Sequence, residues 1–175
     1  MIALYQGTSA VSRLIRWRTW SDYSHAAWVC RDGSVIEAWH VGKGVRRVAG
    51  LLDQHTPGTQ VDLFDVQGLD DGRRYDVETF LLAQLGKPYD FAGIMGFVAA
   101  RRVENPQKWF CSELIFAALQ SVGIDILARI PAWKVTPGLL LLSPTLTNRG
   151  RGSISLAPSL APIALNCTRS PSIAT

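Results

Sequence analysis

Short apolar runs and segments with the helical period together predict a fold that contains both strands and helices. Four runs have the length and the β-branched content of strands, and they occupy residues 2–5, 25–30, 35–41 and 61–66. Asp32 and Gly33 between two of these runs predict a β-hairpin, and residues 46–48 can continue the same sheet. Strands and helices alternate without a repeating βαβ unit. We therefore expect an α+β fold with an antiparallel sheet.

Three segments follow the helical period instead. Ser9 is a candidate cap for a first helix that reaches Trp17, whose arginines we interpret as a solvated face. A second helix is predicted over residues 74–85, before the break at 86–88. A third begins at Cys111 and ends before Gly123. Its apolar positions share one face: Leu114, Ile115, Ala118, Leu119 and Val122.

Composition changes sharply near the end of the chain. The 175 residues are 47% hydrophobic, which is enough for one domain with a sizeable core. From Ser143 onward the chain becomes rich in Ser, Thr, Pro, Asn and Gly and contains no acidic residue. We therefore predict a domain over residues 1–147 and a flexible low-complexity tail over residues 148–175.

The positive charge does not indicate a nucleic-acid partner. The net charge is +4, but Arg149, Arg151 and Arg169 of the predicted tail supply three of these charges. The rest of the chain is close to neutral, and its arginine pairs are separated by acidic residues. We also expect no membrane-spanning segment, because the apolar run at 94–100 is short and contains Gly96.

Cys111 is the best candidate for a nucleophile. A cysteine in the first turn of a helix faces unpaired backbone N–H groups and the positive end of the helix dipole, which favour the thiolate. The other two cysteines, Cys30 and Cys167, form no metal-type spacing or disulfide framework with it. The competing interpretation of Cys111 is a buried core cysteine. A thiol nucleophile also needs a base and a group that orients the base.

His25 is the candidate base, and the hairpin register decides its partner. A two-residue turn at Asp32-Gly33 places His25 opposite His40. A three-residue loop, with Gly33 in the left-handed region, instead makes Glu37 the diagonal neighbour of His25. The residues of the hairpin alone leave both registers open. His55, in the segment Gln-His-Thr-Pro-Gly, is interpreted as a loop residue.

Two motifs resemble a known family. The segment Gly-Lys-Pro-Tyr-Asp-Phe-Ala-Gly at 86–93, followed by Cys-Ser-Glu-Leu at 111–114 and Gly-Ile at 123–124, resembles the papain-like NlpC-type cell-wall peptidases. In that family the histidine follows the cysteine, whereas no histidine follows Cys111 here. The order is similar to the circularly permuted branch, which includes YiiX-like proteins and the lecithin:retinol acyltransferase group. Its hairpin pattern is present at 23–27 and 35–38.

The resemblance implies a permuted papain-like fold with the sheet packed on the cysteine helix. It also implies a triad of Cys111, His25 and Glu37, with His40 in reserve, and Tyr89 beside the oxyanion. The implied activity is hydrolysis of an amide bond, foremost in peptidoglycan stem peptides, without a cofactor. The alternatives are a lipid acyltransferase, thioesterase or phospholipase on a lipid-like acyl substrate, and a non-catalytic binding module.

The first residues of the chain bear on where such a protein acts. The first residues lack the charged start and apolar stretch of a cleavable signal peptide. We therefore expect a cytoplasmic protein, or one delivered to the cell wall by a phage or secretion route.

Overall fold

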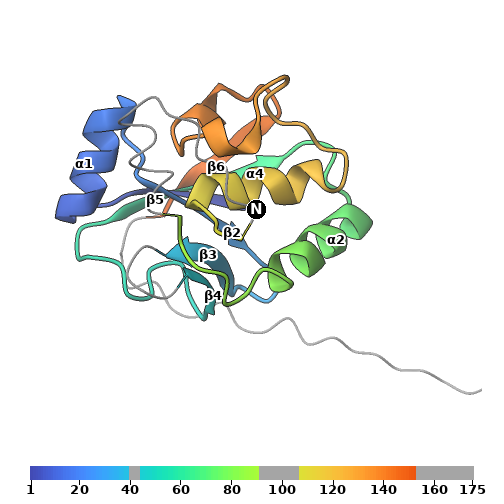
Figure 1. Ribbon diagram of the computed structural model, residues 1–175, viewed down its shortest axis with the longest axis horizontal. Coiled ribbons are helices and arrows are strands. Elements are labelled where there is room, and N and C mark those ends of the chain that lie inside the picture. Colours follow the sequence, from blue (N-terminus) through green and yellow to red (C-terminus); the bar gives the residue numbers. More distant parts are fainter. Residues whose placement is uncertain (40–43, 91–106, 153–175) are drawn as a thin grey trace, which may run out of the picture.

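The computed structural model describes residues 1–39, 44–90 and 107–152, and a six-stranded sheet organises them (Figure 1). The strands lie in the order β4-β3-β2-β1-β5-β6, and every neighbouring pair is antiparallel. The α+β class expected from the sequence is therefore the class of this structure. The strand bounds are β1 (Ile2–Gln6), β2 (His25–Val29), β3 (Val35–Trp39), β4 (Gly44–Val48), β5 (Gln60–Val66) and β6 (Leu146–Gly152).

Helices α1 (Ala10–Thr19), α2 (Asp71–Leu82) and α4 (Cys111–Gln120) accompany the sheet, with short 3₁₀ helices η1 (Ala132–Lys134) and η2 (Leu139–Leu142). Ser9 caps α1 as expected, because its hydroxyl accepts a hydrogen bond from the Ser12 N–H at 3.1 Å. Helix α2 begins three residues earlier than predicted. The Asp70 carboxylate accepts the Arg73 N–H at 2.8 Å, and this cap starts the helix at Asp71.

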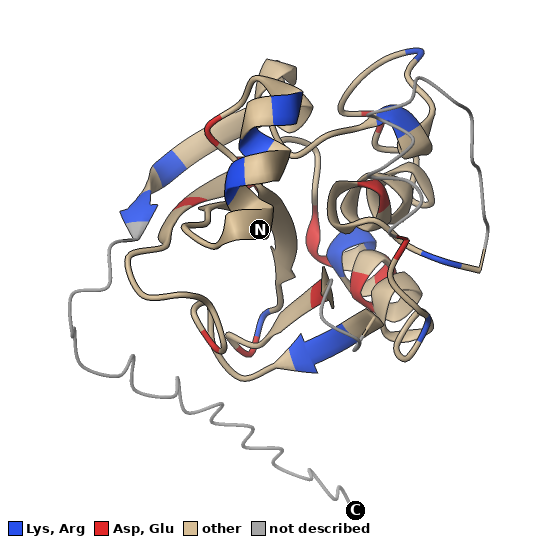
Figure 2. Cartoon of the chain, turned by 60° about the vertical axis from the view of Figure 1, so that its left-hand side comes forward, with Lys and Arg blue, Asp and Glu red and all other residues tan. Residues whose placement is uncertain are grey.

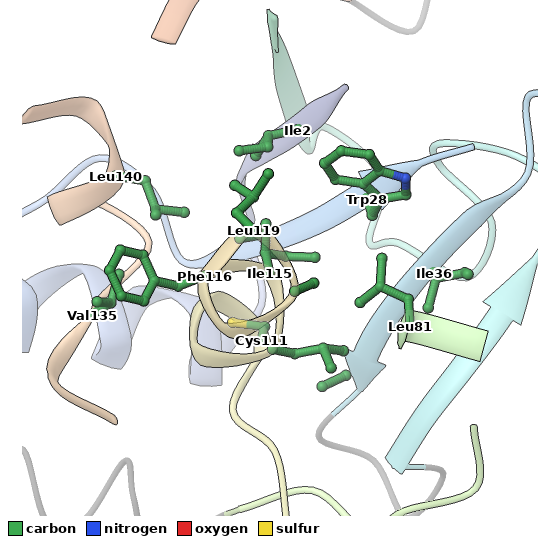
Figure 3. Close-up of a cluster of buried hydrophobic side chains, with 14 of the residues drawn as sticks. Ile2, Trp28, Ile36, Leu81, Cys111, Ile115, Phe116, Leu119, Val135 and Leu140 are labelled. Carbon is green, nitrogen blue, oxygen red and sulfur yellow. The ribbon is translucent and has the colours of Figure 1, made fainter. Parts of the chain in front are cut away.

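The main core lies between the sheet and α4. Helix α4 packs against β2 and β3, while α2 packs against α4 (Figure 1). Figure 3 shows Phe116 of α4 directed toward Val135 and Leu140 of the C-terminal segment. Leu114, Ile115, Ala118 and Leu119 are buried, so the predicted apolar face of this helix is the face that packs.

The opposite face of the sheet carries a smaller cluster that includes Tyr5, Ala27 and Val35. Leu51 and Leu52 pack against this cluster, so the loop between β4 and β5 covers it. That loop continues to His55. A loop that folds over the sheet therefore brings a histidine to the face on which Tyr5 lies.

The hairpin of β2 and β3 has a three-residue loop. Trp28 pairs with Ile36 and Val29 with Val35, and the Cys30 N–H donates to the Ser34 carbonyl at 2.8 Å. Gly33 has a φ of 81°, in the left-handed region that glycine adopts without strain. This is the register that makes Glu37 the neighbour of His25. His40, the residue favoured by the other register, lies outside the described residues.

The predicted domain boundary at 147/148 needs a correction. Residues 148–152 form the second part of β6 and pair with β5, so they belong to the sheet and not to a flexible tail. The Asn-Arg-Gly-Arg-Gly segment lacks the apolar alternation of a strand, and ion pairs accompany its backbone pairing with β5. Arg149 pairs with Asp65, and Arg151 with the buried Asp62. Residues 153–175 lie outside the described part of the chain.

Candidate active site

Cys111, labelled in Figure 3, is the first residue of α4. Its position is held from two directions. The Phe110 N–H donates to the Glu113 carboxylate at 3.2 Å, which closes the first turn of the helix. The Ser112 hydroxyl donates to the Val135 carbonyl and ties the helix start to η1. Cys111 itself is buried, with 1% of its surface exposed.

His25 begins β2 and lies between Glu37 and Cys111. Its Nε2 is 2.7 Å from Glu37 Oε2. Because an ionised carboxylate only accepts hydrogen bonds, Nε2 carries the proton and Nδ1 is the nitrogen left for Cys111. Burial on its own lowers the pKa of His25. The charge of Cys111 and hydrogen bonds with Cys111 and Glu37 outweigh burial and raise the pKa to about 10.

Glu37 is fully buried and is surrounded by cationic and imidazole groups. Arg46 donates to Oε1 from Nε at 2.9 Å and from Nη2 at 2.6 Å. His55 Nε2 lies 3.6 Å from Oε2, the oxygen that His25 also contacts. Burial alone raises the pKa of the carboxyl. The hydrogen bonds and charges of these three residues are stronger and hold the pKa well below its usual range.

His55 is a site residue that sequence reasoning missed. Its ring stacks on Tyr5, with the ring centroids 4.3 Å apart and an interplanar angle of 4°. It also meets Trp39 edge-on, at 4.8 Å between centroids. Burial lowers the pKa of His55 and the charge of His25 adds to this effect, and together they outweigh the hydrogen bond with Glu37, which raises it. No local pattern at 54–58 marks it, because the contact depends on how the loop folds over the sheet.

Tyr89 lies beside Cys111, as the motif at 86–93 implies. Burial raises the pKa of its phenol, and the charge of Cys111 and a hydrogen bond with it raise that pKa further. Backbone pairing fixes the segment: the Trp109 N–H donates to the Pro88 carbonyl at 3.1 Å and the Asp90 N–H to the Trp109 carbonyl at 3.0 Å. The remainder of the motif, 91–93, lies outside the described residues.

A cavity of about 210 Å³ leads to this group. His25, His55 and Tyr89 line it, and helix α1 contributes Val11, Ser12 and Ile15 to the lining. Hydroxyl and amide side chains dominate the rest of the lining: Ser9, Ser24, Gln54, Thr56 and Thr59. Lysine, arginine and carboxylate side chains are absent from the lining among the described residues.

The same cluster has the donor set of a metal site. His25, Glu37 and His55 each offer one ligand-type atom, and these atoms all lie within 4.8 Å of one another. Two imidazoles and a carboxylate suit Zn²⁺ and related cations. The hydroxyl of Tyr5 is buried without a hydrogen-bond partner. It lies close enough to Glu37 for the carboxylate to add to the effect of burial in raising the pKa of the phenol.

Comparison with known proteins finds a solved structure with a similar fold. No protein-family model matches the sequence, and no curated protein matches it either. The structure is similar to the crystal structure of the metalloprotein YiiX from Escherichia coli O157:H7, with a TM-score of 0.67. The two sequences are 20% identical, and the match covers 86% of this chain and 95% of that one. The chain therefore has a YiiX-like α+β fold.

Helices long and apolar enough to cross a bilayer are also absent from the described residues.

Proposed function

We propose that the protein is a cysteine hydrolase of the permuted papain-like type that cleaves an amide bond through Cys111, His25 and Glu37. One observation carries the proposal: His25 contacts Glu37 through Nε2, and the same ring has a hydrogen bond with Cys111. This is the arrangement that a nucleophile, a base and an orienting acid require. The YiiX-like fold supports it at the level of architecture.

In this mechanism His25 Nδ1 holds the proton of the Cys111 thiol, and the thiolate attacks the carbonyl carbon of the substrate. The carbon–nitrogen bond of the tetrahedral intermediate then breaks, and His25 gives the proton to the leaving amine. Water, activated by the same imidazole, cleaves the resulting thioester. Glu37 keeps the ring in one tautomer and stabilises its charged form throughout.

The negative oxygen of the tetrahedral intermediate also needs donors. The backbone N–H of Cys111 is one of the unpaired groups of the helix start. The hydroxyl of Tyr89, which adjoins Cys111, is our candidate for the second donor. Its raised pKa keeps the phenol protonated, as a donor requires.

The cavity lining supports a neutral, polar substrate. Serine, threonine and glutamine side chains offer hydrogen-bond partners to peptide N–H and C=O groups. Val11, Ile15 and Trp39 add apolar surface beside these hydrogen-bonding groups. We therefore place a peptide amide, foremost in a peptidoglycan stem peptide, ahead of a lipid ester or amide.

A metal is compatible with the same residues, since the YiiX structure is that of a metalloprotein. The donor set and the unpartnered Tyr5 hydroxyl fit a divalent cation held by His25, Glu37 and His55. Such an ion supplies positive charge and Lewis acidity when it is bound. The hydrolytic steps above use only the side chains of this chain.

The test is incubation of the purified protein with peptidoglycan fragments, with phospholipids in parallel, followed by mass spectrometry. We expect new amine and carboxylate ends in the peptides, and an acyl adduct on Cys111 in trapped samples. Cys111→Ala should abolish both products, while Cys30→Ala, which removes the other buried thiol, should retain them. Products that persist in Cys111→Ala would contradict the proposal.

A further inference from the structure

Helix α1 has an outer surface that is both apolar and basic. Trp20 at its C-terminal cap is 90% exposed, and Trp17 and Leu14 are 69% and 51% exposed. Large apolar side chains with this exposure are unusual when they lie together. They adjoin Arg13 and Arg16, because positions three and four apart share one face of a helix. We call the set Arg13, Leu14, Arg16, Trp17 and Trp20 the α1 surface.

The charge of this surface has one sign. The helix contains three arginines, at 13, 16 and 18, and no acidic residue (Figure 2). Asp22 is the acidic side chain that lines the same shallow surface hollow, together with Arg13, Arg16, Trp17 and Trp20. The net charge here is therefore positive, although the remainder of the domain is close to neutral.

The inner side of the same helix belongs to the cavity. Ile15 is buried, and it lines the cavity that leads to His25 together with Val11 and Ser12. Helix α1 thus has one side toward the candidate active site and the other toward solvent. Any surface that the outer side binds therefore comes to lie beside a helix that lines this cavity.

We propose that the α1 surface is a docking site for a membrane that contains anionic phospholipids. Tryptophan places its ring at the boundary between headgroups and acyl chains, where its N–H stays hydrated. Arginine binds anionic headgroups, and a short helix with both residue types lies in the plane of the interface. The inference goes beyond the proposed hydrolysis and does not rest on it, because docking requires no turnover.

The test is flotation of the full chain with vesicles, using the Cys111→Ala variant so that no lipid is consumed. We expect binding to vesicles of equimolar phosphatidylcholine and phosphatidylglycerol, and much weaker binding to phosphatidylcholine alone. Trp17→Ala and Arg13→Glu should each weaken binding by roughly tenfold. Tyr75→Ala is the matched aromatic control, because Tyr75 is also 69% exposed but lies on α2, across the molecule from α1 in Figure 1. Arg73→Glu on α2 is the control for charge.

Three results would overturn the proposal. The first is the absence of flotation with either vesicle. The second is equal loss of binding in the α1 and α2 variants, since that would reflect overall charge or hydrophobicity. The third is a dimer in sedimentation velocity that Trp17→Ala dissociates, because the surface would then join two copies of the chain.

Discussion

Arg46 donates two hydrogen bonds to one oxygen of Glu37, Oε1, and leaves Oε2 to the histidines. The arginine side chain is only 10% exposed and that of Glu37 is fully buried, so the pair is shielded from solvent. Each oxygen of the carboxylate therefore has a separate task. Oε1 anchors Glu37 to β4, and Oε2 orients His25.

Because Arg46 holds the buried Glu37 in place, removing the arginine should cause a large loss of stability. Arg46→Ala leaves the buried carboxylate without its arginine partner, which should lower the free energy of unfolding by roughly 3 kcal/mol or more. Arg47→Ala on the same strand breaks an exposed pair with Asp32 and should cost about 1 kcal/mol at most. Urea denaturation of both variants measures the difference. Equal losses would show that Glu37 does not depend on Arg46.

The thiol of Cys111 should be more reactive than that of Cys30. Cys111 faces a helix start and His25, whereas burial, as the largest effect, raises the pKa of Cys30. We expect iodoacetamide to label Cys111 first at pH 6 to 7, with sites assigned by peptide mass spectrometry. His25→Ala should slow the labelling of Cys111 and leave that of Cys30 unchanged. Slow labelling of both thiols would favour a core role for Cys111.

Replacing the orienting acid should lower turnover in a protein that still folds, although with lower stability because Arg46 loses its charged partner. In Glu37→Gln the amide can no longer stabilise a charged His25, and precedent for such groups allows a fall of up to about ten-thousand-fold. His40→Ala should matter much less, since the three-residue hairpin loop makes Glu37 the neighbour of His25. Steady-state kinetics with circular dichroism distinguish activity from folding. If only His40→Ala inactivates the protein, our assignment of Glu37 is wrong.

The ionisation of Glu37 predicts acid sensitivity. The folded-state pKa of this carboxyl is lowered from its ordinary value of 4.5, so its stabilising contribution is complete above that pH. The contribution is lost as the pH falls below 4.5 toward the folded-state pKa. We expect the melting temperature of the wild type to drop steadily below pH 4.5. Glu37→Gln should show a shallower drop in melting temperature. Identical profiles for the two proteins would show that protonation of Glu37 does not cause the acid sensitivity.

Zinc should bind the cluster of His25, Glu37 and His55 and lower turnover. An imidazole bound to a cation through Nε2 keeps its proton on Nδ1, so His25 could not accept the proton of Cys111. We expect calorimetric titration of metal-free protein with Zn²⁺ to show a site that His55→Ala weakens by tenfold or more. Cys30→Ala serves as the control thiol. Unchanged binding in His55→Ala would place the ion elsewhere.

The sequence predicts the parts of the site that depend on local pattern. Cys111 follows from the helical period of α4, and Glu37 follows from counting residues across the hairpin loop once the family resemblance selects the register. His55 could not be found in this way, since its contact with Glu37 arises from the loop that covers the second face of the sheet. Strand β6 could not be predicted from the sequence for a related reason. Its Arg-Gly residues carry no apolar alternation, and the strand is recognised only from its backbone pairing with β5 and the ion pairs with Asp62 and Asp65.

The close approach of β4 to the segment before Tyr89 protects the sheet from unwanted association. A side-chain carbon at Gly44 would lie 2.0 Å from the Lys87 carbonyl oxygen, so only glycine fits there. This approach lets the Val45 N–H donate to the Lys87 carbonyl at 2.8 Å and the Gly86 N–H donate to the Val45 carbonyl at 2.9 Å. An edge strand with free backbone groups is a template for adding strands from other molecules. At Val45 both groups are already satisfied, so the strand that anchors Glu37 is guarded there against aggregation through its edge.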